Sequence, residues 1–250
     1  MKITVLGCWG PYPRAGGACS GYLFEHEDTK ILIDCGNGIL SRLQQMIKNF
    51  EEIDMIIISH LHSDHISDAM VLRYALGIQQ AKGLIAKSIP LYAPGAPRED
   101  FEKLQFQNAF ALKEIDGDSA IHFRGLEISF RQMDHPVPSY AVKIEKDHKK
   151  FVYSGDTKYC HSIFEFAEGA DLLLCECGVL ERDKTPDTAH LSAKEAGEIG
   201  QKSHVKKLLL THFWPGYSLE DIYNEAKAVY DGELILSEEM KTYDVSSDAW

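Results

Sequence analysis

The segment ISHLHSDHISD, residues 58–68, carries three histidines and one aspartate within the six positions from His60 to His65. It follows an apolar run, so side chains able to bind a metal appear where a buried strand should end. In extended chain, side chains at positions i and i+2 point the same way, and His60 and His62 can therefore converge on one ion. Asp64 and His65 lie past the bend and can face another. Imidazole and carboxylate groups at this density are typical of sites for zinc or a similar metal.

The alternative is that Ser63 or Asp64 caps the next helix and the histidines are surface polar residues. Three more candidate ligands, however, also follow predicted strands: His135, Asp156 and His212. Each alone has an ordinary explanation, as a loop histidine, a Gly-Asp turn or a strand-end histidine. Their shared placement at strand ends favours a site for two metals.

The elements that position these residues can be predicted from hydrophobic periodicity and turn residues. In the first third, strands are predicted at Lys2–Leu6, Gly21–His26, Lys30–Asp34 and Ile53–Ser59, and helices at Ile39–Lys48 and Asp68–Gln79. Further strands are predicted at Leu91–Ala93, Leu126–Met133, Tyr140–Glu145, Phe151–Ser154, Asp171–Cys175, Lys207–Thr211 and Glu233–Leu236. Helices are predicted at Ser192–Ser203 and Leu219–Tyr230, and a surface helix plus loop at Pro94–Asp118.

Strands cluster first and then alternate with helices, and this order repeats loosely in the two halves of the chain. No Pro/Gly/Ser-rich linker separates the halves. We therefore expect an α/β fold of two packed mixed sheets with helices outside, forming a single domain over residues 1–250.

The ligand pattern resembles the metallo-β-lactamase superfamily, whose four-layer αββα fold holds one or two metals on a His-x-His-x-Asp-His loop. The resemblance covers nearly the whole chain. It implies that His60, His62 and His135 bind one metal and that Asp64, His65 and His212 bind the other. Asp156 would bridge both ions, which are expected to be Zn²⁺, with Mn²⁺ as the alternative.

Within this superfamily, the motifs are similar to the phosphodiesterase branch typified by ribonuclease Z. The third-histidine motif reads MDHPVPSY over residues 133–140. The thioesterase and lactonase branches of the superfamily instead have a segment similar to Gly-His-Thr-Pro-Gly at this position. The segments SGDTKYC at 154–160 and THF at 211–213 are similar to the same branch.

The resemblance also implies catalytic roles for Glu176 and His190, from the segments CEC at 175–177 and AHLSA at 189–193. His190 would donate a proton to the leaving group, Glu176 would hold and polarise it, and Asp64 would assist the attacking water. A nearby imidazole has a clear task in such a reaction, because an alkoxide is a poor leaving group at neutral pH. The alternative for His190 is a solvent-facing residue ahead of a helix cap at Ser192.

The chain departs from ribonuclease Z proteins where they carry a long arm that grips tRNA. Only residues 157–175 separate Asp156 from Glu176, which leaves no room for it. Together with a net charge of −12, this favours a cyclic nucleotide or short oligonucleotide as substrate. Three alternatives remain: a lactone or thioester hydrolase on the same metals, a ribonuclease Z-type tRNA 3′ endonuclease, and a non-catalytic metal-binding module.

Composition limits the remaining possibilities. The chain lacks an apolar run long enough to span a bilayer and a recognisable signal segment, so a cytoplasmic protein without a membrane role is expected. The six cysteines favour free thiols over a disulfide framework, and Cys175 and Cys177 are expected to be structural. A homodimer is possible, because proteins related to this family often form one.

Overall fold

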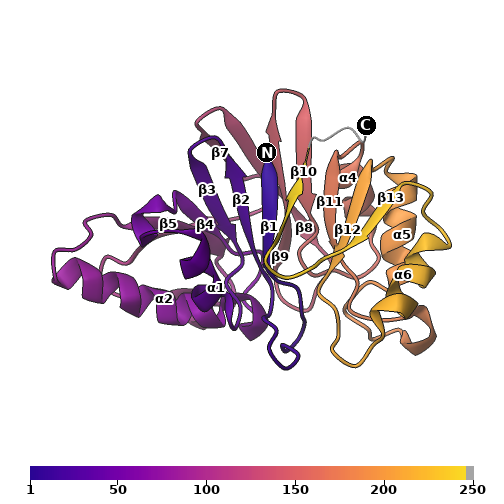
Figure 1. Ribbon diagram of the computed structural model, residues 1–250, viewed down its shortest axis with the longest axis horizontal. Helices are drawn as coiled ribbons and strands as arrows, with labels where there is room; N and C mark the ends of the chain where they lie inside the picture. Colours follow the sequence, from indigo (N-terminus) through magenta and orange to yellow (C-terminus); the bar gives the residue numbers. More distant parts are fainter. Residues whose placement is uncertain (246–250) are drawn as a thin grey trace. The chain divides into compact units, whose positions relative to one another are not determined.

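The computed structural model describes residues 1–245, which divide into two compact units. Unit 1 comprises Met1–Ile115 and Glu238–Tyr243, and unit 2 comprises Asp116–Ser237 and continues from Asp244. Each unit is built on one seven-stranded mixed sheet with helices packed on it (Figure 1). The single domain predicted over residues 1–250 stays a prediction.

The sheet of unit 1 has the strand order β14-β1-β2-β3-β4-β5-β6. Strands β1 to β3 are antiparallel, and β3 to β6 run parallel. The strands are β1 (Lys2–Gly7), β2 (Gly21–His26), β3 (Thr29–Ile33), β4 (Met55–Ile57), β5 (Ile89–Pro94), β6 (Phe110–Ile115) and β14 (Lys241–Asp244); the helices are α1 (Ile39–Met46), α2 (Ser63–Ala81), α3 (Arg98–Lys103) and the short 3-10 helix η1 (Phe50–Glu52).

Helix α2 begins five residues earlier than the predicted start at Asp68, which corrects that boundary. His62 is its N-cap in extended conformation, so Asp64 and His65 lie in the first helical turn. The predicted start lies too far along the chain because polar residues fill the first turn. The helical spacing of apolar residues can be recognised only from Ala69 onward.

The sheet of unit 2 has the order β13-β12-β11-β10-β9-β8-β7, antiparallel from β7 to β10 and parallel from β10 to β13. The strands are β7 (Ala120–Phe123), β8 (Leu126–Met133), β9 (Ser139–Lys146), β10 (Lys149–Tyr153), β11 (Leu172–Glu176), β12 (Lys207–Thr211) and β13 (Glu233–Leu236). The helices are α4 (His161–Ala167), α5 (Ala193–Lys202), α6 (Leu219–Lys227) and the 3-10 helix η2 (Glu181–Asp183). Helices α5 and α6 pack on each other, α5 against β11 and β12 and α6 against β13 (Figure 1).

The start of α5 is determined locally. The Ser192 side chain accepts a hydrogen bond from the backbone of Glu195, and the Glu195 side chain accepts one from the backbone of Ser192. This capping box satisfies two N–H groups that the helix leaves unpaired. It fixes the chain two residues after His190.

The structure corrects the expectation of only a helix and loop at Pro94–Asp118. Helix α3 is present, but strand β6 follows it at the edge of the sheet of unit 1. Most of the β6 side chains are not buried, so the strand lacks the apolar signal of the central strands. Strands β7 and β14 were also missed: both are four-residue edge strands, and nearly all of their side chains lie outside the core. Helix α4, at seven residues, was missed as well.

Within residues 1–245, every helix is too short or too polar to span a lipid bilayer. The six cysteines are free thiols, as predicted.

Candidate metal and catalytic site

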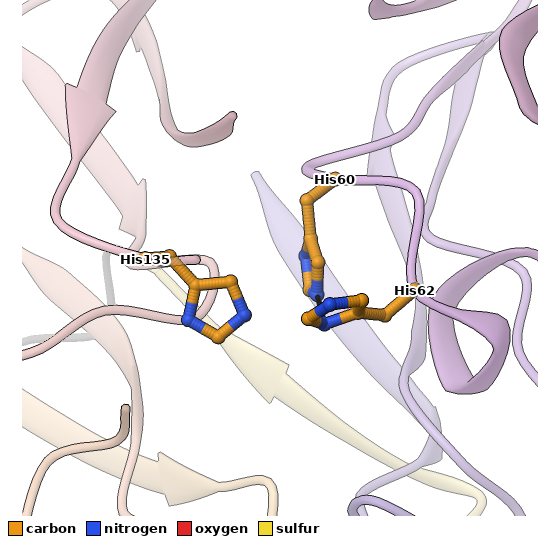
Figure 2. Close-up of side chains that lie close together, drawn as sticks. All are labelled: His60, His62 and His135. Carbon is orange, nitrogen blue, oxygen red and sulfur yellow. Dashed lines mark hydrogen bonds between the residues drawn. The ribbon is translucent and has the colours of Figure 1, made fainter. Parts of the chain in front are cut away.

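The four ligand residues predicted in unit 1 lie on the loop after β4 and in the first turn of α2. Nε2 of His60 and Nδ1 of His62 are 3.1 Å apart, and Figure 2 shows their rings meeting on this loop. Nε2 of His65 lies 3.5 Å from Oδ2 of Asp64, and the ring of His65 is 4.0 Å from that of His60. The extended loop thus brings His60 and His62 together as their i, i+2 spacing predicted.

Asp34 orients this loop through hydrogen bonds to Ser59 and His65. It follows β3, which pairs in parallel with β4, so its carboxylate meets the start of the ligand loop. Oδ1 accepts the backbone N–H of Ser59 at 2.8 Å, and Oδ2 accepts the Ser59 hydroxyl at 2.9 Å and Nδ1 of His65 at 2.8 Å. Asp34 is fully buried with φ of 57°, a left-handed conformation that aspartate tolerates better than most residues.

These bonds fix which nitrogen of each ring carries the proton. A carboxylate only accepts, so Nδ1 of His65 is the donor and Nε2 keeps its lone pair. Because the Ser59 hydroxyl gives its proton to Asp34, it accepts from Nδ1 of His60, 3.1 Å away. One buried aspartate therefore leaves Nε2 of both His60 and His65 able to bind a metal.

The backbone packs tightly behind the same segment. Cys35 N–H donates to the His65 carbonyl at 2.8 Å, and the Cys35 carbonyl accepts from Asp68 and Ala69. A Cβ atom at Gly36 would lie 1.9 Å from the carbonyl oxygen of Asp64. Only glycine fits there, because a methyl group would collide with backbone rather than with a movable side chain.

In unit 2, Asp156 and His212 follow strands β10 and β12 and are both buried. Oδ2 of Asp156 lies 3.2 Å from Nε2 of His212. Gly155, with φ of 59°, turns the chain toward Asp156, and the backbone of His212 is also left-handed, with φ of 59°. This conformation is uncommon outside glycine, although histidine adopts it more readily than most residues.

Glu176 and His190 form a hydrogen-bonded pair in the same unit. Glu176 is fully buried at the end of β11, and its Oε1 accepts Nδ1 of His190 at 3.1 Å. The same carboxylate also accepts the backbone N–H groups of Thr157 at 2.9 Å and Gly178 at 3.1 Å. These bonds prevent Glu176 from rotating and keep Nδ1 of His190 as the donor to this carboxylate.

His135, on the loop after β8, is oriented in a similar way. Its Nδ1 donates to the carbonyl of Ala189 at 3.2 Å, which leaves Nε2 as the nitrogen with a lone pair. Its ring centre lies 5.5 Å from that of His190, and the ring of His190 stacks on that of His212 at 5.1 Å. Unit 2 thus gathers His135, Asp156, Glu176, His190 and His212 at one edge of its sheet.

The ligand atoms fit a bound metal within each unit. Nitrogen and oxygen ligands in a tetrahedral zinc site lie roughly 3.3–3.6 Å from one another. The 3.5 Å between Asp64 and His65 falls in this range, and the His60–His62 and Asp156–His212 separations of 3.1 and 3.2 Å lie just below it. The set contains only imidazole and carboxylate groups, which suits zinc and manganese.

Sequence reasoning missed Asp34 and Ser59, which touch the ligand rings without being predicted ligands. A signal was present, because Asp34 ends a predicted strand that could pair in parallel with the next one. Parallel strands deliver their last residues to the same edge of a sheet. Nothing in the sequence pointed to the backbone groups of Thr157, Gly178 and Ala189, since any residue type can supply them.

Comparisons with known proteins agree with this architecture. The profile of the Beta-lactamase superfamily domain matches residues 29–213. The probable metallo-hydrolase YhfI of Bacillus subtilis is 34% identical over 94% of this chain and 96% of its own. Its crystal structure matches with a TM-score of 0.92 over 97% of this chain and 98% of its own, at 33% identity. A ribonuclease Z of Ignicoccus hospitalis is 25% identical over 92% of this chain and 93% of its own.

The chain therefore belongs to the beta-lactamase superfamily. The predicted α/β fold class is confirmed as the metallo-β-lactamase fold. The coarse functional prediction, a metallo-hydrolase related to ribonuclease Z, is confirmed as well.

Proposed function

We propose that this metallo-hydrolase is a phosphodiesterase that cleaves a small phosphodiester, either a cyclic nucleotide or a short oligonucleotide. The observation that carries the proposal is the buried Glu176 carboxylate, which holds Nδ1 of His190 at 3.1 Å. Cleaving a phosphodiester releases an alkoxide that needs a proton, whereas a thioester releases a thiolate that needs none. A fixed imidazole beside candidate metal ligands suits the first reaction better.

The metal part of the proposal follows the family pattern. His60, His62 and His135 would hold one divalent ion, Asp64, His65 and His212 a second, and Asp156 both. Two such ions, Zn²⁺ or Mn²⁺, would lower the pKa of water and offset the negative charge on phosphoryl oxygens. The fit of the ligand atoms within each unit supports this assignment, as does the orientation of three rings by Asp34, Ser59 and Ala189.

Three side chains, Asp64, His190 and Glu176, would take part in proton transfer. Asp64 would orient the attacking water and take one of its protons. The water oxygen would form the new bond to phosphorus as the bond to the departing oxygen breaks. Protonated His190 would give its Nε2 proton to that oxygen, and Glu176 would stabilise the imidazolium through Nδ1. The proton held by Asp64 would then return to His190 through solvent. The products are an alcohol and a phosphate monoester.

The segment between Asp156 and Glu176 supports a small substrate. Residues 157–175 are taken up by α4 and by β11, which is part of the sheet. They offer no extended arm for a folded RNA. The six reduced thiols also fit the cytoplasm, where such a nucleotide substrate would be met.

A substrate screen on metal-loaded protein tests the proposal. The panel contains an aryl phosphodiester, cyclic nucleotides, a short oligonucleotide, a lactone, a thioester and a precursor tRNA. We expect turnover of the small phosphodiesters. Turnover of only the lactone or thioester, efficient cleavage of only precursor tRNA, or binding of metal without turnover would each support one alternative and reject this proposal.

We also propose that two copies of the chain associate through α2. Three large apolar side chains, Val71, Tyr74 and Ile78, are exposed on it at i, i+3 and i+7 spacing, while its other face is buried. A helix that is apolar on both faces is usually covered on both. The run 69–98 also contains no acidic residue although the chain has a net charge of −12, so two acidic copies can meet there with little repulsion.

Sedimentation velocity tests this association. The wild-type protein should be a dimer at micromolar concentration, and Ile78→Glu should make it monomeric. The matched control is Tyr223→Glu, which places the same charge on an exposed aromatic of α6. A monomeric wild type, or a dimer that survives Ile78→Glu, would show that α2 is not the interface.

A further inference from the structure

The turn from Trp214 to Tyr217 holds a large aromatic side chain in the solvent beside His212. Trp214 is 38% exposed, although the preceding residue, Phe213, is fully buried. The other tryptophan of the described chain, Trp9, is buried. The exposed part of the indole offers apolar surface that a flat ligand can cover.

Two ring contacts and one backbone hydrogen bond restrict the orientation of this indole. A Cβ atom at Gly216 would lie 2.7 Å from Cη2 of Trp214, so the ring rests directly on the glycine backbone. The Tyr217 ring meets it edge-on, with 4.7 Å between ring centres, and the Tyr217 N–H donates to the Trp214 carbonyl at 3.1 Å. An exposed aromatic with few accessible orientations loses little entropy when it binds a ligand.

The same turn is tied to the segment that leads to His190. The Tyr217 hydroxyl lies close to the carboxylate of Asp183 and to the backbone of Leu180. These residues lie on the connection between Glu176 and His190. The turn that carries the indole therefore lies beside the chain that leads to the predicted proton donor.

The position of Trp214 places it within one nucleotide's reach of the chemistry. Thr211 and Glu176 are paired in register at the ends of β12 and β11, so His212 leaves the sheet beside Glu176. Two residues span at most about 7 Å, so the Cα of Trp214 lies no farther than that from the Cα of His212. A nucleotide whose phosphoryl group lay near His190 and His212 would therefore be long enough to reach the turn that carries Trp214.

We infer that Trp214 stacks on the nucleobase of the substrate and thereby selects nucleotides among phosphodiesters. This inference rests on the proposed function and narrows its substrate class to diesters that bear a base. Every base has a π-face, so a single indole serves without hydrogen-bond readout and predicts tolerance among bases. Trp214 is a specificity-determining residue in this account, not a proton donor or a metal ligand.

Binding of a product-like probe tests the inference without relying on turnover. Adenosine 5′-monophosphate and ribose 5-phosphate differ only by the base, and titration calorimetry on metal-loaded protein gives both affinities. The wild type should prefer the base-bearing probe. Trp214→Ala should reduce the ratio of the two affinities roughly 5- to 150-fold, the range measured when stacked aromatics are replaced by alanine. Trp214→Phe should keep most of the preference.

Tyr223→Ala is the matched control, because Tyr223 on α6 is 37% exposed, close to the 38% of Trp214. It should leave the ratio unchanged, and thermal melts should show that all three variants are folded. A wild type without preference for the base, or a Trp214→Ala protein with an unchanged ratio, overturns the inference. If the wild type prefers the base but cleaves no phosphodiester, the proposed reaction fails while the assignment of Trp214 stands.

Discussion

The two units supply their halves of the predicted site in different ways. Unit 1 takes four ligands from the six positions His60–His65 and orients two of them with one buried carboxylate, Asp34. Unit 2 takes its residues from separate strand ends and orients them with Glu176 and with backbone groups. In unit 1 one buried side chain is enough to orient a compact ligand loop, whereas the dispersed residues of unit 2 depend on the register of the whole sheet.

The halves also differ in chemistry. In unit 1 the oriented rings present nitrogens for metal binding, and Asp64 is the one residue there with a predicted second role. Unit 2 combines the buried Asp156 and His212 with a histidine that binds a carboxylate and remains partly exposed. We therefore expect losses in unit 1 to act mainly through metal content, and losses in unit 2 to separate metal content from turnover.

The largest effect is expected from removing a predicted metal ligand in either half. Wild-type protein should contain two divalent ions per chain by elemental analysis. Asp156→Ala should lose metal and reduce turnover to background, because this carboxylate is the proposed bridge between both ions. His62→Ala should lose one ion, because the other retains its own ligands. Trace metal in the wild type, or unchanged metal in Asp156→Ala, would falsify the dinuclear assignment.

His190→Ala in unit 2 should reduce turnover without reducing metal content. General acid catalysis contributes about 10²–10⁴-fold, so turnover of an alkyl phosphodiester should fall by about that factor while metal content stays the same. A nitrophenyl diester should lose much less rate, because its phenolate departs without a proton. Equal losses on both substrates, or loss of metal, would leave His190 as a structural residue or a ligand.

The contrast between the halves also explains how much the sequence could predict. The loop His60–His65 was legible because its spacing is local and its residue types are those of metal ligands. His135, Asp156 and His212 were found only through strand ends and the family resemblance, since each has common alternatives. Asp34 was overlooked because its role depends on the parallel pairing of β3 with β4, a long-range feature that one chain segment does not reveal.

The fold follows the same rule. Strands β8 and β12 match their predicted bounds, because β8 shows apolar residues at alternate positions over most of its length and β12 is a buried, largely apolar run. Strand β6 carries charged residues, and β7 has only four residues, none of them buried, so the pairing partners of these edge strands determine them more than their own residues do. The start of α2 was misplaced because chemistry, not packing, dictates the residues of its first turn.

A smaller effect is expected at Asp34, which tests whether one carboxylate supports the half-site of unit 1. Asp34→Ala removes the acceptor for Ser59 and His65, and outer partners of metal ligands typically contribute 10–100-fold to metal affinity. Chelator competition should show a loss of about this size. Asp34→Asn keeps a residue that tolerates a φ of 57° and keeps one acceptor, so its loss should be smaller. Equal losses would assign the effect to the backbone and not to the carboxylate.

The smallest effects are expected at two glycines, Gly36 beside Asp64 in unit 1 and Gly178 beside His190 in unit 2. The comparison shows whether each neighbouring group can shift to make room for a methyl group. A Cβ at Gly36 would meet the Asp64 carbonyl at 1.9 Å, whereas one at Gly178 would meet the Cβ of His190 at 3.1 Å. Overpacking against backbone typically costs about 1–3 kcal/mol, so Gly36→Ala should lower the free energy of unfolding by that amount and weaken metal binding.

Gly178→Ala requires His190 to shift by only a few tenths of an ångström, so stability and metal content should hardly change. Because that side chain is the proposed proton donor, its turnover of an alkyl diester should fall more than its turnover of a nitrophenyl diester. Denaturant titration measures the free energy of unfolding, elemental analysis measures the metal content, and assays on the two diesters measure turnover. A Gly178→Ala protein less stable than Gly36→Ala would contradict the prediction that only Gly36 faces an immovable group.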